Sequence, residues 1–137
     1  MLLAVDIGNT NMEFGIFERN QLKASFRLAT HHDVTSDELG LSIRQFFLIH
    51  GIDLSTLEDV LISSVVPQVI YSVKNAMRKY LGIEPMIVQE NFNINIVNRY
   101  DNPAEVGACL LYTSILQRLP KLNPVQNFHR GVCLLLF

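Results

Sequence analysis

The stretch that decides the fold is AVDIGNTNMEFGIF, residues 4–17. An apolar run reaches the carboxylate of Asp6, the polar run Gly8-Asn9-Thr10-Asn11 follows, and an apolar pattern then resumes. Because Gly-Asn favours tight turns, the pattern predicts two strands joined by a turn just after the carboxylate. A plain β-turn and a turn that binds a ligand both fit these residue types.

The next stretch adds a third strand to this hairpin. Residues 21–28 alternate apolar and polar side chains, which predicts a strand with one buried face and one solvated face. The apolar members are Leu22, Ala24, Phe26 and Leu28, and the polar members are Lys23, Ser25 and Arg27. With strands predicted at residues 2–6 and 11–17 and a polar connection at 18–20, we expect consecutive antiparallel strands.

Helical patterns follow. Thr35 and Glu38 have the spacing of a capping box, and apolar residues at helical spacing continue until Gly51. A second helix is predicted to begin at Pro67, which suits a first helical turn, and to stop at Gly82.

Short apolar strands are predicted at residues 59–66 and 85–88, on either side of the second helix. Residues 91–98 fit either an edge strand or an extended loop. The order β-β-β-α-β-α-β predicts an α/β fold with a mixed sheet, antiparallel at first and parallel afterwards. This is the ribonuclease H-like arrangement that actin-like ATPases, sugar kinases and ribonuclease H-type nucleases share, so the order alone does not choose a function.

The composition narrows the class of protein. The chain has 137 residues, of which 49% are apolar, enough for a folded core. Its net charge of −2 gives no electrostatic footprint for nucleic acid. The apolar N-terminal run stops at Asp6, too soon for a signal peptide or a membrane span. Both cysteines, Cys109 and Cys133, lie near the C-terminal end, so no disulfide can form within the main body of the chain, which is compatible with a reducing compartment. We therefore expect a cytoplasmic protein with no nucleic-acid or membrane partner.

The turn after Asp6 has the chemistry of a phosphate site. Gly8 lets the backbone approach a ligand closely, and Asn9 and Thr10 bring short hydrogen-bonding side chains. A carboxylate beside a phosphate needs a cation between them, and Mg²⁺ binds one or two carboxylates together with phosphate oxygens. The Gly-Lys-Ser/Thr run of a Walker A loop does not occur. This interpretation predicts that the turn holds the terminal phosphates of a nucleotide, with Asp6 directed at the metal.

Three segments in order along residues 1–108 resemble the motifs of type III pantothenate kinases. Asp6-Ile7-Gly8-Asn9-Thr10, followed by Gly15 and Phe17, looks like the family's first phosphate motif. Ser63-Ser64-Val65-Val66-Pro67 resembles a second signature of the family. Tyr100-Asp101-Asn102-Pro103-Ala104-Glu105-Val106-Gly107-Ala108 is similar to its pantothenate-binding segment.

The resemblance implies transfer of the ATP γ-phosphate to the 4′-hydroxyl of pantothenate, the first step toward coenzyme A. It implies ATP, Mg²⁺ and a monovalent cation, K⁺ or NH₄⁺, as cofactors, and a homodimer as the assembly. The implied ATP-binding residues are Asp6, Ile7, Gly8, Asn9, Thr10, Asn11, Met12 and Glu13, with Asp6 also at the metal. The implied pantothenate-binding residues are Tyr100, Gly107 and Ala108.

The chain departs from the family after Ala108. The family continues with Asp-Arg, the Asp serving as general base, whereas this chain has Cys109 and Leu110. The resemblance therefore assigns no catalytic residue, and we expect the chain as printed to be inactive.

Residues 109–137 contain no acidic residue, and their beginning looks like one reading frame of a sequencing adapter. We expect residues 1–108 to be the first, ribonuclease H-like nucleotide-binding domain of a two-domain kinase, truncated, and residues 109–137 to be a chimeric tail. A divergent but genuine C-terminus is the alternative.

Other functions remain open on the sequence alone: another actin-like phosphotransferase, a non-catalytic binding fragment, or, with least support, a nuclease. His31-His32-Asp33 fits either metal ligation or, as adjacent histidines before a capping box more often are, a solvated loop.

Overall fold

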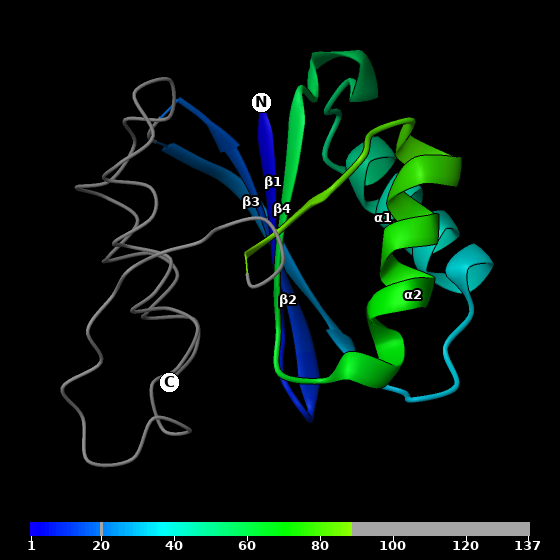
Figure 1. The fold of residues 1–137 in the computed structure, drawn as a ribbon. Helices are drawn as coiled ribbons and strands as arrows, with labels where there is room; N and C mark the ends of the chain where they lie inside the picture. The colour runs from blue at the N-terminus through cyan, green and yellow to red at the C-terminus, as the bar shows by residue number, and fades with distance from the viewer. Residues whose placement is uncertain (20, 89–137) are drawn as a thin grey trace, which may run out of the picture.

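The computed structural model describes residues 1–19 and 21–88, which form a five-stranded sheet with helices packed on one face (Figure 1). The strands are β1 (Leu2–Ile7), β2 (Asn11–Glu18), β3 (Gln21–Ala29), β4 (Asp59–Ser64) and β5 (Met86–Ile87). The helices are α1 (Ser36–Ile49), the 3-10 turn η1 (Leu54–Thr56), α2 (Pro67–Ala76) and the π-helical turn η2 (Met77–Leu81). The strand or loop suggested at residues 91–98 lies outside the described residues.

The strand order across the sheet is β3-β2-β1-β4-β5. Strand β2 pairs antiparallel with both β1 and β3, whereas β4 pairs parallel with both β1 and β5. The predicted element order and the mixed, ribonuclease H-like sheet are both confirmed. Because β1 and β4 are parallel neighbours, their carboxyl ends lie at the same edge of the sheet, where open α/β sheets commonly bind ligands.

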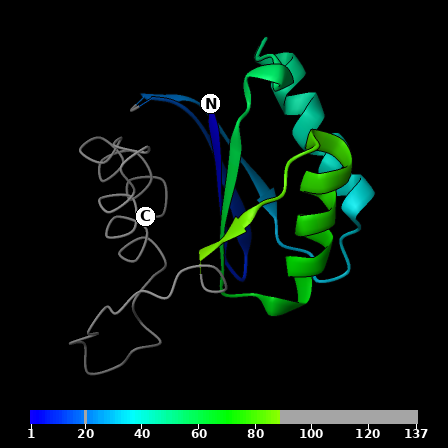
Figure 2. The same cartoon turned by 45° about the horizontal axis from the view of Figure 1, so that its top comes forward.

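The core lies between the sheet and the two helices, which cover the same face (Figure 2). Alternate side chains of the central strands enter it and are fully buried: Leu3, Val5 and Ile7 from β1, and Met12, Phe14 and Ile16 from β2. Aromatic rings extend this core toward β3, where Phe26 stacks on Phe14 and on Phe46 of α1, with ring centroids 4.3 and 3.8 Å apart. Burial of this apolar set is the main favourable contribution to folding.

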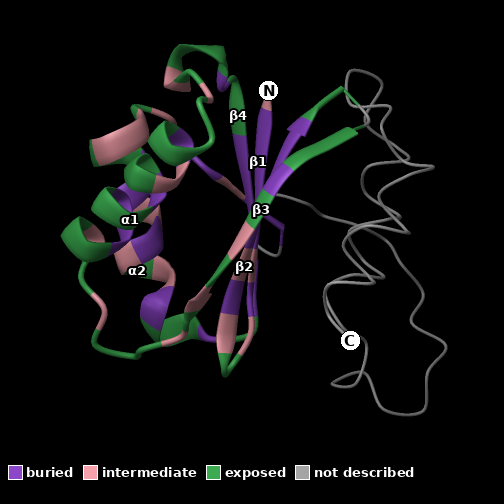
Figure 3. Cartoon of the chain, turned by 180° about the vertical axis from the view of Figure 1, so that it is seen from behind, coloured by how far each residue is buried: buried purple, intermediate pink, exposed green. Residues whose placement is uncertain are grey.

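Burial decreases from the middle of the sheet toward its β3 edge (Figure 3). The alternation predicted for residues 21–28 is present but incompletely buried: Ala24 is buried, Phe26 and Leu28 are half-buried, and Leu22 is exposed. The reason is position, because β3 is the edge strand and the hairpin end that it forms with β2 curves away from the helices (Figure 1).

The helices begin and end as the sequence predicts, apart from the last turn of the second. Thr35 caps α1, since its hydroxyl accepts from the Glu38 amide at 3.2 Å and the Glu38 carboxylate accepts from the Thr35 amide at 2.9 Å. Gly51 and Gly82 follow the two helices with φ of 63° and 70°, in the left-handed region that favours glycine. Helix α2 begins at Pro67, but its end widens into η2, which the apolar periodicity did not indicate. Among the described residues, no helix is long and apolar enough to cross a membrane.

Two strands are shorter than predicted. Strand β4 stops at Ser64 rather than Val66, because the Ser64 hydroxyl accepts from the Val66 amide at 3.0 Å and turns the chain toward α2. Strand β5 covers only Met86–Ile87 of the predicted residues 85–88.

Side chains of the π-helical turn η2, which follows α2, contact the first turn of α1. The Lys79 ammonium lies 2.6 Å from an Asp37 carboxylate oxygen, and the Tyr80 hydroxyl donates to the same oxygen at 2.8 Å. The Tyr80 ring lies directly over Gly40, so that a Cβ atom at Gly40 would overlap it. A glycine inside α1 is therefore explained by the close approach of this ring.

Replacing Gly40 by alanine tests this packing. By helix propensity alone, replacing glycine with alanine inside a helix stabilises the helix by about 1 kcal/mol. An added methyl group in a packed site, however, typically costs about 1–3 kcal/mol of stability. We expect Gly40→Ala to lower the free energy of unfolding, measured by urea denaturation of the 137-residue chain. The exposed helix variant Ser42→Ala is the control and should change stability little. In a Tyr80→Ala background the same Gly40 substitution should become neutral or stabilising, and an undiminished loss there would contradict the ring contact.

Candidate functional site

The turn between β1 and β2 is built by close backbone contacts. The Gly8 amide donates to the Asn11 carbonyl at 2.9 Å, and a Cβ atom at Gly8 would lie 3.3 Å from that oxygen. This is tighter than an ordinary contact, so glycine fits here because the backbone approaches closely. Asn9 and Thr10 form the exposed tip of the turn. We call residues 8–11 the phosphate turn, after the role that the sequence predicts.

Thr30, the first residue after β3, fastens the phosphate turn from its β3 side. Its amide donates to the Thr10 carbonyl and its hydroxyl donates to the Gly8 carbonyl, both at 2.8 Å. No sequence motif indicates a role for Thr30 at this turn, because Thr30 lies 20 residues beyond Thr10 and no motif links them. The one available signal was the predicted hairpin, whose register brings the end of β3 beside the start of β2.

A row of polar side chains crosses the sheet on the face opposite the helices. The register pairs Asp6 of β1 with Ser63 of β4 on one side and with Glu13 of β2 on the other. Glu13 in turn pairs with Arg27 of β3, and their side chains form an ion pair. Because Val5 and Ile7 enter the helix-side core, alternation places Asp6 on the opposite face.

The environment of Asp6 disfavours its charge in the absence of a cation. Burial raises the pKa of the Asp6 carboxyl above its ordinary value, a hydrogen bond from Ser63 lowers it, and the neighbouring Glu13 charge raises it. The net result is a raised pKa. A cation beside this carboxylate would offset both the burial and the repulsion.

These residues fit a magnesium ion only if a phosphate shares it. Within residues 1–19 and 21–88, no three His, Cys, Asp or Glu side chains are placed to hold a metal ion by themselves, and His31 and His32 are exposed. Mg²⁺ in nucleotide sites takes one or two carboxylates, phosphate oxygens and waters. The single half-buried carboxylate of Asp6, beside the turn, suits that donor set.

The structure brings together part of the predicted ATP-binding set. Asp6 and the phosphate turn, Gly8 through Asn11, lie at one edge of the sheet. The side chains of Ile7 and Met12 are fully buried in the helix-side core, so only their backbone atoms can contribute to a site at the turn. Glu13 is engaged by Arg27.

The second predicted signature, residues 63–67, reaches the same edge of the sheet. Ser63 pairs with Asp6, and the Val65 amide donates to the Ile7 carbonyl at 3.0 Å. Helix α2 then begins at Pro67, so the phosphate turn and the β4–α2 connection lie side by side (Figure 1). Ser63 belongs to the second signature, but its residue type and place in the motif did not indicate a role beside Asp6. The predicted substrate residues Tyr100, Gly107 and Ala108, and Cys109, lie outside the described residues.

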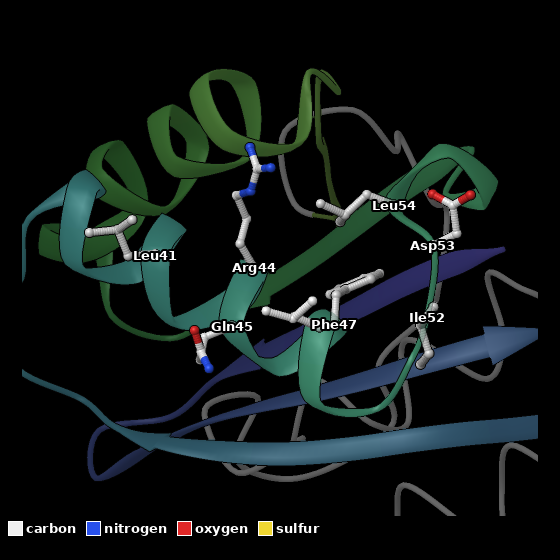
Figure 4. Close-up of a pocket in the computed structure, with 8 residues that line it drawn as sticks. Leu41, Arg44, Gln45, Phe47, Ile52, Asp53 and Leu54 are labelled. Atoms are coloured by element: carbon white, nitrogen blue, oxygen red, sulfur yellow. The ribbon is translucent and has the colours of Figure 1, made fainter.

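A separate pocket of about 550 Å³ lies between α1 and the segment 52–54 that follows it (Figure 4). It is lined by Leu41, Arg44, Gln45, Phe47, Leu48, Ile52, Asp53 and Leu54. None of the predicted site residues lines it, so it does not belong to the arrangement around Asp6.

Comparison with known proteins agrees with the motifs. A family model described as type III pantothenate kinase matches residues 2–118. The type III pantothenate kinase of Finegoldia magna is 43% identical over 107 residues, which are 78% of this chain and 41% of that protein. The chain thus spans about two fifths of the length of this relative. Among solved structures, the ROK hexokinase of Thermus thermophilus aligns with a TM-score of 0.48 and 13% identity, covering 63% of this chain and 34% of the hexokinase.

The raised pKa of Asp6 predicts that the carboxylate costs stability when no ligand is bound. The folded protein holds the Asp6 proton more tightly than the unfolded chain, so stability falls as the pH rises from the ordinary value of 3.8 through the raised pKa. Asp6→Asn should therefore raise the free energy of unfolding of the 137-residue chain at pH 7, and this gain should shrink toward pH 4. Urea denaturation across that range measures it, with the exposed Asp59→Asn as control. A less stable Asn variant at pH 7 would contradict this account.

Proposed function

Because this chain belongs to the type III pantothenate kinase family, we propose that residues 1–108 form the nucleotide-binding half of a pantothenate kinase. The reaction is transfer of the ATP γ-phosphate to the 4′-hydroxyl of pantothenate, the first step of coenzyme A synthesis. The observation that carries the proposal is the phosphate turn, a fastened backbone turn with exposed donors beside the half-buried carboxylate of Asp6.

In this proposal, the phosphate turn binds the phosphate oxygens, and Asp6, held by Ser63, binds the metal ion. The close backbone approach at Gly8 leaves room for phosphate oxygens, and the amides and side chains of Asn9 and Thr10 donate hydrogen bonds to them. Asp6 orients the magnesium ion, and Ser63 holds the Asp6 carboxylate in place. When bound, Mg²⁺ supplies neutralisation of the charge on the transferring phosphoryl group.

The acceptor side of the site rests on family membership. We propose that Tyr100, Gly107 and Ala108 bind pantothenate, and that K⁺ or NH₄⁺, a homodimer and a cytoplasmic location carry over from the family. In the family an Asp at the position of Cys109 removes the proton of the attacking hydroxyl. A cysteine does not replace that carboxylate, because it differs in reach and in charge at neutral pH.

The proposal is tested in a completed protein, in which residues 1–108 are joined to the remaining sequence of the Finegoldia magna relative so that the family's Asp-Arg pair follows Ala108. Asp6→Asn in this protein should leave the fold intact and lower pantothenate-dependent ADP release by on the order of 10²-fold or more, because the metal loses its protein ligand. Asp59→Asn, at the other end of the sheet, is the matched control. Turnover of the Asp6 variant close to that of the unaltered protein would remove Asp6 from the metal site.

The 137-residue chain itself should show no pantothenate-dependent ATP consumption. A positioned general base is typically worth ~10²–10⁴-fold in rate, and the family base position is occupied by Cys109. A coupled assay for ADP, run beside the completed protein, measures this. Turnover by the 137-residue chain that Asp6→Asn abolishes would show that residues 109–137 are a working part of the enzyme.

A further inference from the structure

We propose that Thr30 is a positioning residue for nucleotide binding: it fixes the phosphate turn so that the donors at its tip face a ligand. The proposal rests on the proposed function and adds to it a residue that the sequence motifs do not contain. It follows from two hydrogen bonds, one from the Thr30 amide to the Thr10 carbonyl and one from its hydroxyl to the Gly8 carbonyl, both 2.8 Å long.

The hydroxyl bond sets the direction of the next amide. The peptide between Gly8 and Asn9 is planar and trans, so its C=O and N–H groups point in opposite directions. With the Gly8 carbonyl held by Thr30, the Asn9 N–H is directed away from β3. The second bond fixes the peptide plane after Thr10 in the same way. Thr30 thus fixes the peptide plane before Asn9 and the peptide plane after Thr10, so the Asn9–Thr10 peptide is held from both of its sides.

The phosphate turn has little else to hold it. Asn9 and Thr10 are exposed, and apart from the two bonds to Thr30 the turn is closed by the Gly8 amide donating to the Asn11 carbonyl at 2.9 Å. In residues 1–19 and 21–88 the Asn9 and Thr10 amides donate to no protein group. An amide that binds a phosphate cannot at the same time donate to another protein group. The orientation of these amides therefore has to be set by hydrogen bonds to the carbonyl groups of the turn.

Preorganised donors bind more tightly because less conformational entropy is lost on binding. Thr30 is also neutral, so it orders the turn without placing a further charge beside the triphosphate. A plain structural role for Thr30 predicts something different: lower stability on losing the hydroxyl, but unchanged nucleotide affinity in the folded protein.

Three substitutions separate these roles. Thr30→Val keeps the hydrogen bond from the backbone amide and the shape of the side chain but removes the hydroxyl. Thr30→Ser keeps both hydrogen bonds. Thr56→Val is the matched control, because the Thr56 hydroxyl also donates to a backbone carbonyl, that of Asp53, at 2.6 Å, near the amino end of β4.

Equilibrium binding of a magnesium complex of non-hydrolysable ATP to the completed protein is the first measurement. One hydrogen bond is worth about 0.5–1.5 kcal/mol, so we expect Thr30→Val to weaken nucleotide binding roughly three- to tenfold. Pantothenate affinity should stay within about twofold, as should the nucleotide affinity of Thr30→Ser and Thr56→Val. Nucleotide affinity of Thr30→Val within twofold of the unaltered protein, or equal losses for valine and serine, would overturn the proposal.

The second measurement needs no nucleotide and uses the 137-residue chain. Amide ¹⁵N relaxation of Asn9 and Thr10 should report increased motion in Thr30→Val and normal order in Thr30→Ser. Unchanged relaxation in Thr30→Val overturns the proposal. Asp6→Asn distinguishes this failure from failure of the proposed function: if that variant keeps full magnesium-dependent affinity, the nucleotide site is wrongly assigned, and the relaxation data still decide whether Thr30 orders the turn.

Discussion

The alternation of side chains along β1 is the constraint on which the rest of the structure depends. Val5 and Ile7 are fully buried against the helices, and a shift of one residue would take both out of the helix-side core and put Asp6 there instead. The apolar residues therefore fix the register of the central strand, and the register fixes the position of the carboxylate. Asp6 is directed to the face opposite the helices because its two neighbours are committed to the core.

The sheet topology then assembles the chemistry from distant parts of the chain. Parallel pairing of β1 and β4 brings Ser63 beside Asp6, and the antiparallel hairpins bring Glu13, and then Arg27, into the same row. Thr30 reaches the phosphate turn because β3 ends beside the start of β2. Each contact follows from strand pairing, so the relative positions of these side chains are set by the register of the sheet.

The same arrangement disfavours the charged form of Asp6. Asp6 is partly desolvated and lies next to a second carboxylate, which raises its pKa, while Arg27 partly offsets the charge of Glu13. Such a group destabilises a protein without ligand and becomes favourable when a cation binds. Surface ion pairs such as Lys79 with Asp37 are worth little by comparison, so the stability of the domain comes mainly from its apolar core.

The sequence by itself determined the elements and the identity of the turn. Alternation along residues 21–28, the capping box at Thr35, and the stops at Gly51 and Gly82 act through contacts within a few residues, which a linear pattern records. Only the tertiary structure decided which residues meet: Ser63 with Asp6, Thr30 with the phosphate turn, and Tyr80 with Gly40. These contacts join positions 20 or more residues apart, and they depend on strand register and on helix docking. Both are set by burial of the whole core, so no local stretch of sequence encodes them.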